Sequence, residues 1–228
     1  MSISHAPCPL VVAPTPMEYA AVHKALKKAQ LEHKIQLVCC GMGEANATRL
    51  CQGLDPGEVS CLVLLGWAGG LVPGLPVGAR VCADRALHAG APPLACLPLP
   101  LAACRTGAML TSPVALITPQ EKQAALPGGA LAVEMEAYPL AAWATRLGIP
   151  FIHARIILDP LEEALYDTAS FMDSSGQLRV GSLLKTTIQH PGWLVPMARL
   201  IRRVRALDPL LGNLAIDCIQ AVIDPLHP

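Results

Sequence analysis

The sequence has few charged and few aromatic residues. Asp, Glu, Lys and Arg make up 15% of the 228 residues, Phe, Trp and Tyr make up 4%, and 17 basic residues balance 17 acidic ones. A chain without net charge has no long-range field that would steer it to nucleic acid or to an acidic partner. We therefore expect no nucleic-acid partner, and any electrostatic preference must be local.

The sequence also lacks the features of an exported protein. Its first residues have neither the basic start nor the small-residue cleavage site of a signal peptide, which predicts a cytoplasmic protein. Two uncharged stretches, Val59 to Ala79 and Ala86 to Cys104, are as long as a membrane span. Their glycines and prolines would interrupt a helix, so we interpret both as buried strands and loops.

The nine cysteines form no CxxC pair, and their number is odd. Most of them lie in apolar runs, as buried free thiols do, so we expect neither disulfides nor a zinc or other metal site. A cysteine nucleophile that works with His88 or His153 is a weaker alternative, because no local motif puts a thiol on a strained turn.

Apolar residues, by contrast, are abundant, at 53% of the chain. In a chain of this length they predict a single domain, residues 1–228, with one large core and one site. A fraction this high, with so few charges, also indicates that part of the apolar surface faces a membrane or an apolar ligand.

The order of apolar runs and helix caps predicts a mainly parallel sheet. Strands are expected at residues 10–13, 35–40, 61–65, 131–133 and 151–158. Helices are expected at residues 16–29, 44–54, 136–147, 181–189, 193–207 and 211–223. The first helix begins with a capping box, Thr15-Pro16-Met17-Glu18. Residues 66–113 are rich in Gly and Pro, which favours twisted strands and loops. Strands that alternate with helices form parallel sheets.

Three acidic residues stand where an apolar strand meets a helix signal: Glu18, Glu136 and Asp159. The carboxyl ends of parallel strands form one edge of a sheet, where ligands bind, so the three carboxylates are expected to converge on one crevice. Each has a plainer explanation by itself. Acids are favoured in the first turn of a helix, and Asp159 before Pro160 has the form of an ordinary N-cap.

Six segments together resemble the nucleoside phosphorylase and nucleosidase superfamily. They are Thr-Pro-Met-Glu (15–18), Cys-Gly-Met-Gly-Glu-Ala-Asn-Ala (40–47), Gly-Trp-Ala-Gly-Gly-Leu (66–71), Pro-Val-Gly-Ala-Arg-Val (76–81), Ala-Val-Glu-Met-Glu-Ala (132–137) and Arg-Ile-Ile-Leu-Asp (155–159). The nearest general match is to methylthioadenosine/S-adenosylhomocysteine nucleosidases, which are cofactor-free hydrolases. The resemblance implies a three-layer α/β phosphorylase/hydrolase-like fold, with a central mixed, mostly parallel twisted sheet flanked by helices, and a homodimer or larger assembly.

The resemblance also implies a role for each acid. Glu136 would hold the ribose 2′ and 3′ hydroxyls, with Met135 packing on the sugar. Asp159 would protonate the purine at N7, and Glu18 would orient and deprotonate an attacking water. These residue types suit the chemistry, because the sugar becomes oxocarbenium-like while the departing base gains negative charge that an acid neutralises.

Further substrate contacts are expected from the same segments. Glu134 and Gly69 belong to the quoted motifs, while Leu116 and Ile117 fall near the place where nucleosidases sandwich the base, without the aromatic found there. Trp67 replaces a small or hydroxyl residue and is expected to reshape the pocket or to pack in the core. Four arginines lack a matching phosphate-binding motif: Arg49, Arg80, Arg85 and Arg105. We therefore expect no cofactor and favour hydrolysis, with inorganic phosphate as the alternative co-substrate.

Acidic residues are absent from Ser174 to Leu207, whereas basic residues are frequent there: Arg179, Lys185, Arg199, Arg202, Arg203 and Arg205. Apolar residues recur at helical spacing beside these arginines, which predicts a basic amphipathic helical part at about 180–207. This part either packs on the domain with its arginines in water or docks to anionic lipid. The contacts in the second case would be Trp193, Arg199, Arg202, Arg203 and Arg205.

Residues 173–185 and 189–200 resemble the hopanoid-associated branch of the superfamily, and ordinary nucleosidases lack this tail. That branch is implicated in removing adenine from adenosylhopane to give ribosylhopane. A bilayer substrate would explain an apolar mouth and a basic helix, and it predicts a location at the inner face of the cytoplasmic membrane. The alternatives are a soluble methylthioadenosine/S-adenosylhomocysteine-type nucleosidase and a catalytically silent relative that binds a nucleoside or lipid.

Overall fold

The computed structural model describes residues 6–125, 128–165 and 194–224. The strands are β1 (Cys8–Ala13), β2 (Gln36–Cys39), β3 (Val59–Gly70), β4 (Arg80–His88), β5 (Leu94–Ala95), β6 (Cys104–Thr111), β7 (Ala132–Glu134) and β8 (Phe151–Asp159). The α-helices are α1 (Pro16–Lys28), α2 (Glu44–Gly53), α3 (Pro119–Ala125), α4 (Ala137–Leu147) and α6 (Leu194–Ile223). Two short 3-10 helices, η1 (Glu32–Lys34) and η2 (Pro56–Glu58), join them.

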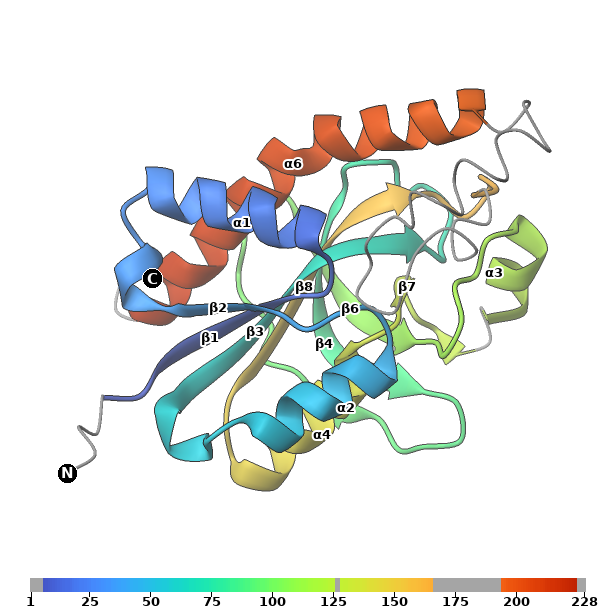
Figure 1. The fold of residues 1–228 in the computed structure, drawn as a ribbon. Coiled ribbons are helices and arrows are strands. Elements are labelled where there is room, and N and C mark those ends of the chain that lie inside the picture. Colours follow the sequence, from blue (N-terminus) through green and yellow to red (C-terminus); the bar gives the residue numbers. More distant parts are fainter. Residues whose placement is uncertain (1–5, 126–127, 166–193, 225–228) are drawn as a thin grey trace.

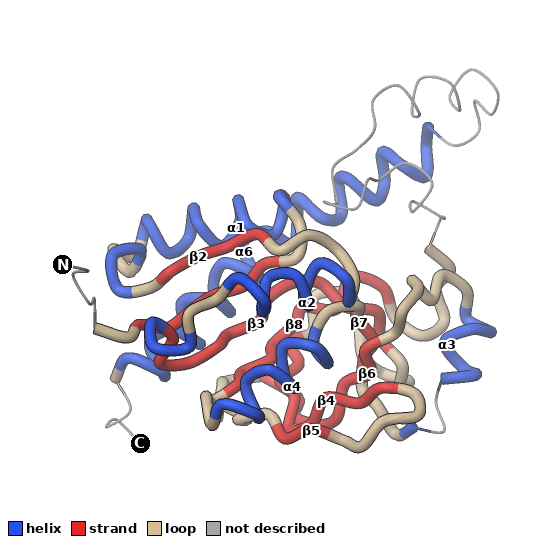
Figure 2. The backbone as a smooth tube through the Cα atoms, turned by 60° about the horizontal axis from the view of Figure 1, so that its bottom comes forward, coloured by secondary structure: helices blue, strands red, loops and turns tan. Residues whose placement is uncertain are grey.

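The helices cover both faces of one sheet, as the predicted three-layer α/β fold requires. Figure 1 shows α1 and α6 on one face and α2 and α4 on the other. In the turned view of Figure 2, α2 and α4 again lie side by side in front of the strands. The predicted fold class is therefore confirmed.

The sheet is mixed, and part of it closes on itself. Strands β2, β1, β3 and β8 pair in parallel. Strand β8 then pairs antiparallel with β4, β4 pairs parallel with β6, β6 with β7, and β7 returns antiparallel to β3. The pairing thus forms a ring of five strands, which brings the end of β7 beside the ends of β3 and β8.

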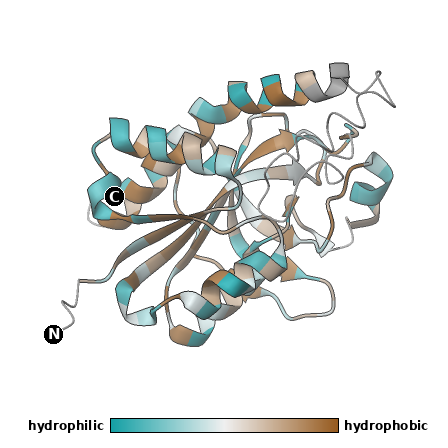
Figure 3. Ribbon diagram, in the orientation of Figure 1, coloured by the Kyte–Doolittle hydropathy of each residue, from teal (hydrophilic) through white to brown (hydrophobic). Residues whose placement is uncertain are grey.

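Two cores lie on the two faces of the sheet. Successive side chains of a strand point to opposite faces, so Leu62 and Leu64 of β3 pack toward α4, while Val63 and Leu65 pack toward α1 and α6. Strands buried on both faces read as continuous apolar runs, which is why residues 59–70 resemble a membrane span in sequence. Figure 3 shows the apolar strands between helices with hydrophilic outer faces.

Local signals determine where most helices begin and end. The capping box at Thr15 and Glu18 is present at the start of α1. Helix α4 ends at Gly148, whose φ of 67° lies in the left-handed region that glycine adopts without strain. The expected strands and helices up to residue 158 are present, with shifts of a few residues, and β3 runs five residues beyond the predicted Leu65. Helix α3 was not predicted.

The stretches predicted as helices at 193–207 and 211–223 are helical from Leu194 on, but the predicted break between them is wrong, because the structure has one continuous helix, α6. Pro209 lies inside it, and proline normally interrupts a helix. Buried Leu207, Leu211 and Leu214 pack against the core and α1, so tertiary packing holds the helix together. The helix predicted at 181–189 and the residue Trp193 lie outside the described residues.

Residues Ala198–Ile223 of α6 are long and apolar enough to cross a membrane by length and composition, with a mean hydropathy of 1.4. The helix nevertheless packs along α1, where Gly212 lies so close that a Cβ on it would stand 2.7 Å from the Cβ of Ala25. A core helix of an α/β fold has the same length and composition. We therefore interpret α6 as part of the fold.

Candidate functional site

One pocket, with a cavity of about 220 Å³, brings the three acids together. It lies where the ends of β1, β3, β7 and β8 meet α6. Its acidic lining residues are Glu18, Glu134, Glu136 and Asp159, and Arg155 also lines it. Its apolar lining residues include Met17, Met42, Trp67, Val114, Leu116, Val133, Met135, Leu158, Leu165, Leu200 and Val204. A pocket with apolar walls and a few converging charged groups is the usual form of a small-molecule site.

Glu18 is buried at the start of α1, and its carboxylate has two structural duties. Its Oε2 accepts hydrogen bonds from the Thr15 amide and hydroxyl, at 2.8 and 2.7 Å, which completes the capping box. Its Oε1 accepts a hydrogen bond from the Trp67 amide at 2.7 Å. One lone pair on Oε1 therefore remains for a ligand. Burial raises the pKa of Glu18, and the charge of nearby Arg155 partly offsets this.

Glu136 reaches away from its own helix. It stands at the N-cap of α4 but makes no capping hydrogen bond. Its Oε1 accepts a hydrogen bond from the Gly43 amide at 2.7 Å, and its Oε2 accepts one from Arg155 at 3.2 Å. Burial raises its pKa to about 7, with the charge of Glu134 adding to the effect and that of Arg155 opposing it. Each oxygen retains a lone pair for a ligand hydroxyl.

Glu134, and not Glu136, caps the N-terminus of α4. Its Oε2 accepts hydrogen bonds from the amides of Glu136 and Ala137, both at 2.9 Å, and from Arg155 at 2.6 Å. Its Oε1 accepts a hydrogen bond from the Thr111 hydroxyl at 2.6 Å. Glu134 lines the pocket, as expected, but protein donors already occupy both oxygens.

Arg155 is the buried cation at the centre of this cluster. Besides Glu134 and Glu136 it lies 4.0 Å from Glu18, so three carboxylates face one guanidinium. Its Nε donates to His153 at 3.0 Å, and burial together with Arg155 lowers the pKa of His153 well below its usual range. Burial lowers the pKa of Arg155, but the carboxylates more than offset this and hold it charged. If all three carboxylates are ionised, the cluster has an excess of negative charge, which favours a ligand that becomes cationic.

Asp159 ends β8 on the other side of the pocket. No helix follows it within residues 160–165, so the N-cap explanation is wrong. Its Oδ2 forms an ion pair with Lys122 of α3, and both side chains are buried. Burial raises the pKa of Asp159 to about 6, although the Lys122 hydrogen bond and charge lower it. A carboxyl group with this pKa can donate a proton near neutral pH.

Two glycines of β3 make room for these side chains. A Cβ on Gly66 would collide with the carboxylate of Glu18 and the guanidinium of Arg155. A Cβ on Gly69 would stand 3.3 Å from both Asp159 and Val133. Glycine at 66 is therefore a packing requirement of the charged cluster, and at 69 any larger residue would crowd Asp159 and Val133.

Sequence reasoning and the structure agree on most lining residues. Met135, Gly69, Trp67 and Leu116 line the pocket. Ile117 is not among the described lining residues; its amide hydrogen-bonds to Glu121. The Trp67 side chain also packs against the core under α6, so it joins the pocket to that core.

Arg155 and the α6 residues Leu200 and Val204 line the pocket but were not predicted. Lys122, which pairs with Asp159, was not predicted either. The signal for Arg155 is its place inside the apolar run of β8, where an unpaired charge would be costly. A single lysine in α3 carries no such signal.

Helix α6 forms one wall of the pocket and carries the predicted basic face. Leu200 and Val204 line the cavity, whereas Arg199, Arg202 and Arg205 are exposed. Arg203 differs from its neighbours, because it pairs with Glu163 at 2.7 Å and donates to the Leu158 carbonyl at 3.3 Å. Arg203 is therefore partly engaged within the fold, and its contact with lipid stays a prediction.

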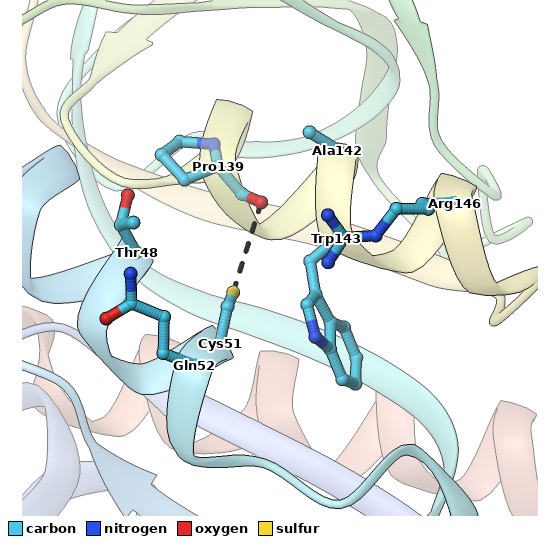
Figure 4. A pocket seen from close by; sticks show the side chains of 7 residues that line it. All are labelled: Thr48, Cys51, Gln52, Pro139, Ala142, Trp143 and Arg146. Carbon is cyan, nitrogen blue, oxygen red and sulfur yellow. Dashed lines mark hydrogen bonds between the residues drawn. The ribbon is translucent and has the colours of Figure 1, made fainter.

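A second hollow, of about 320 Å³, lies between α2 and α4 (Figure 4). Its lining contains Cys51, which donates weakly to the Pro139 carbonyl at 3.9 Å, and Arg146, but no carboxylate. Burial raises the pKa of Cys51 to about 11, which keeps it protonated. His88 pairs with Glu44 and His153 with Arg155. These contacts oppose Cys51 as a nucleophile that works with His88 or His153.

Comparisons with known proteins agree with the fold. The model of the phosphorylase superfamily matches residues 103–188. No curated protein matches the chain. Solved structures of nucleosidases do match, so the structure has the nucleosidase and phosphorylase fold.

The particular proteins that it resembles are nucleosidases for 5′-methylthioadenosine and S-adenosylhomocysteine. The Helicobacter pylori enzyme with butyl-thio-DADMe-Immucillin-A is 12% identical, with a TM-score of 0.67 and coverage of 96% of this chain and 99% of that one. The Streptococcus pneumoniae enzyme with 8-aminoadenine is 21% identical, with a TM-score of 0.60 and coverage of 78% and 97%. The H. pylori futalosine hydrolase is 13% identical, with a TM-score of 0.59 and coverage of 69% and 87%. At these identities the likeness concerns the fold.

Proposed function

We propose that this protein cleaves the N-glycosidic bond of a purine nucleoside. One observation carries the proposal: three buried acids, Glu18, Glu136 and Asp159, line one pocket with apolar walls. Burial raises the pKa of each of these acids. Acids with raised pKa values in a cleft are typical of sites of acid and base catalysis. The match to the phosphorylase superfamily and the likeness to nucleosidases support the same activity.

The three acids divide the reaction among them. Asp159 donates its proton to N7 of the purine, which accepts the electrons of the breaking bond. Glu136 accepts hydrogen bonds from the ribose hydroxyls through its two free lone pairs. The excess negative charge around Arg155 stabilises the oxocarbenium-like sugar. Glu18 accepts the proton of the water that attacks the sugar, and its raised pKa makes it a stronger base.

Water fits the nucleophile position better than phosphate does. Among the described residues, Arg155 is the cation beside Glu18, and the carboxylates of Glu134 and Glu136 already pair with Arg155. A phosphate dianion there would face three carboxylates, whereas water would not. We therefore propose hydrolysis, with no cofactor and no phosphate co-substrate.

The substrate that we propose is adenosylhopane, a nucleoside whose 5′ side carries a triterpenoid. The apolar residues of the pocket support this proposal, because they extend the cavity to the exposed Met17 and Val114. Helix α6 adds a second argument, since one helix has Leu200 and Val204 in the pocket wall and arginines on its exposed face. A lipid-linked substrate needs an apolar mouth close to a surface that binds anionic lipid.

The substrate can be identified by measuring adenine release by chromatography. The assay uses adenosylhopane and methylthioadenosine separately, each with and without inorganic phosphate. We expect release from adenosylhopane that does not depend on phosphate. The Asp159→Asn variant, purified in parallel, is the control for contaminating nucleosidases.

Each other outcome of this assay rejects a specific part of the proposal. Release from methylthioadenosine alone would support a soluble methylthioadenosine/S-adenosylhomocysteine-type nucleosidase. Release that requires phosphate would reject hydrolysis. If neither nucleoside is cleaved, the protein is a catalytically silent relative that binds a nucleoside or lipid.

Removing the exposed arginines is expected to weaken membrane binding. In the variant with Arg199, Arg202 and Arg205 changed to glutamine, binding to vesicles of anionic lipid should fall roughly 100-fold, since each basic residue near such a surface contributes about 1 kcal/mol. Vesicle co-sedimentation measures this. The matched control changes Lys24, Lys27 and Lys28 of α1, also exposed, to glutamine. Equal losses in both variants would reject α6 as the membrane contact and, with it, a location at the inner face of the cytoplasmic membrane.

A further inference from the structure

Lys122 is a fully buried lysine whose ammonium group is held by Asp159 and two backbone carbonyls. Its Nζ donates to the carbonyls of Pro160 and Glu163, both at 2.8 Å, and pairs with the Asp159 carboxylate. A buried ammonium group costs several kcal/mol unless it is paired and hydrogen-bonded. Three bonds to one short segment, residues 159–163, therefore fix that segment around the lysine.

The charged groups around Asp159 come from three elements. Lys122 belongs to α3, Glu163 to the loop that follows β8, and Arg203 to α6. Lys122 and Arg203 favour the ionised form of Asp159, whereas Glu163 disfavours it. Arg203 and Glu163 also pair with each other, and Arg203 bonds the carbonyl of Leu158, which directly precedes Asp159.

We propose that Lys122 is a positioning residue for Asp159, which orients the carboxyl group and stabilises the carboxylate that remains after proton donation. This inference rests on the proposed function. When the glycosidic bond breaks, its electron pair goes to the purine, the Asp159 proton moves to N7, and Asp159 becomes an anion beside the ammonium group. Water adds to the sugar carbon and gives its proton to Glu18, so charge and atoms balance.

Lys122 has opposite effects on two parts of the catalysis. It makes Asp159 a stronger acid, which favours proton transfer. It also lowers the pH at which Asp159 loses its proton, which reduces the active fraction at high pH. Removing the ammonium group should therefore slow the reaction and widen its pH range.

The test is the pH dependence of kcat/KM with the nucleoside that the wild-type protein cleaves. In Lys122→Met, the limb at high pH should move up by about one unit or more, because a neighbouring opposite charge shifts a pKa by about 1 to 3 units. In Glu163→Gln the limb should move in the opposite direction, to lower pH, since a negative charge is lost. Lys122→Arg, which keeps the charge, should restore the limb toward the wild-type pH.

Glu162→Gln is the matched control, because Glu162 is the exposed neighbour of Glu163. Its limb should stay at the wild-type pH. A purely structural role for Lys122 would lower activity and stability and leave every limb in place, and that result would overturn the proposal. Because Lys122→Met loses three bonds and is at risk of misfolding, Lys122→Gln, whose amide can still donate to the carbonyls of Pro160 and Glu163, is the second test of the charge. Glu163→Gln shows that the limb belongs to Asp159.

An infrared titration separates this proposal from the proposed function. The carboxyl band of Asp159, assigned by its loss in Asp159→Asn, reports its protonation without any turnover. If no nucleoside is cleaved but the band titrates at higher pH in Lys122→Met, the proposed function fails and the pairing stands. If the band titrates at the same pH in wild type and in Lys122→Met, Lys122 does not control the protonation of Asp159.

Discussion

The Asp159→Asn variant is expected to fold and to bind nucleoside but to release base at least about 100-fold more slowly. Asparagine has nearly the same size, but its amide cannot donate an acidic proton to N7. Chromatographic assays of kcat and KM measure the effect, and a thermal melt checks the fold.

The same assignment predicts the pH dependence of the wild-type protein. Burial raises the pKa of Asp159 to about 6, so below this pH the carboxyl group holds its proton. The value of kcat/KM should therefore fall as pH rises through about 6, where the proton donor is lost. Wild-type activity in Asp159→Asn, or a kcat/KM without a falling limb at high pH, would contradict the role of Asp159 as the acid.

Replacing Arg155 by methionine is expected to have the largest effect on stability. The three carboxylates around Arg155 would lose their common cation while still buried. Breaking a buried ion pair by removing one partner costs about 3–5 kcal/mol, which lowers Tm by roughly 10 °C in a protein of this size. Denaturant unfolding and thermal melts at pH 8 measure the loss.

Arg85→Met is the control for Arg155→Met, because Arg85 is exposed and pairs with Asp84 at 3.3 Å. Its stability should stay within about 0.5 kcal/mol of wild type. The variant at 155 should partly recover at low pH, where Glu18 and Glu136, both with raised pKa values, gain protons. An unchanged Tm for Arg155→Met at pH 8 would show that the carboxylates are not held by its charge.

Local signals in the sequence predicted most of the fold. The capping box at Thr15 and the glycine at 148 determine helix ends through contacts within a few residues, so they can be read without the rest of the chain. The apolar runs of β1, β3 and β8 require burial on both faces, which predicts a covered, mostly parallel sheet. The α6 region could not be predicted in this way, because packing on α1 and the core outweighs the local effect of Pro209.

The sequence alone also identified the acids but not their surroundings. Glu18 and Glu136 stand where a helix begins, and Asp159 stands where a strand ends, which are local properties. Glu134 and Glu136 are two residues apart in one motif, yet one caps α4 and the other reaches Gly43, a division that depends on where α2 begins. Lys122 reaches Asp159 only because α3 packs beside the end of β8.

What the sequence determined is therefore the kind of fold, which follows from periodicity and caps over a few residues, and the positions of the acids next to the ends of apolar runs. What only the tertiary structure decided is the electrostatic environment of those acids. The closed ring of strands brings β7 beside β3, burial raises the pKa values, and Arg155 and Lys122 each neutralise one part of the site. Charges interact through space, so partners that are distant in sequence become evident only when the chain is folded.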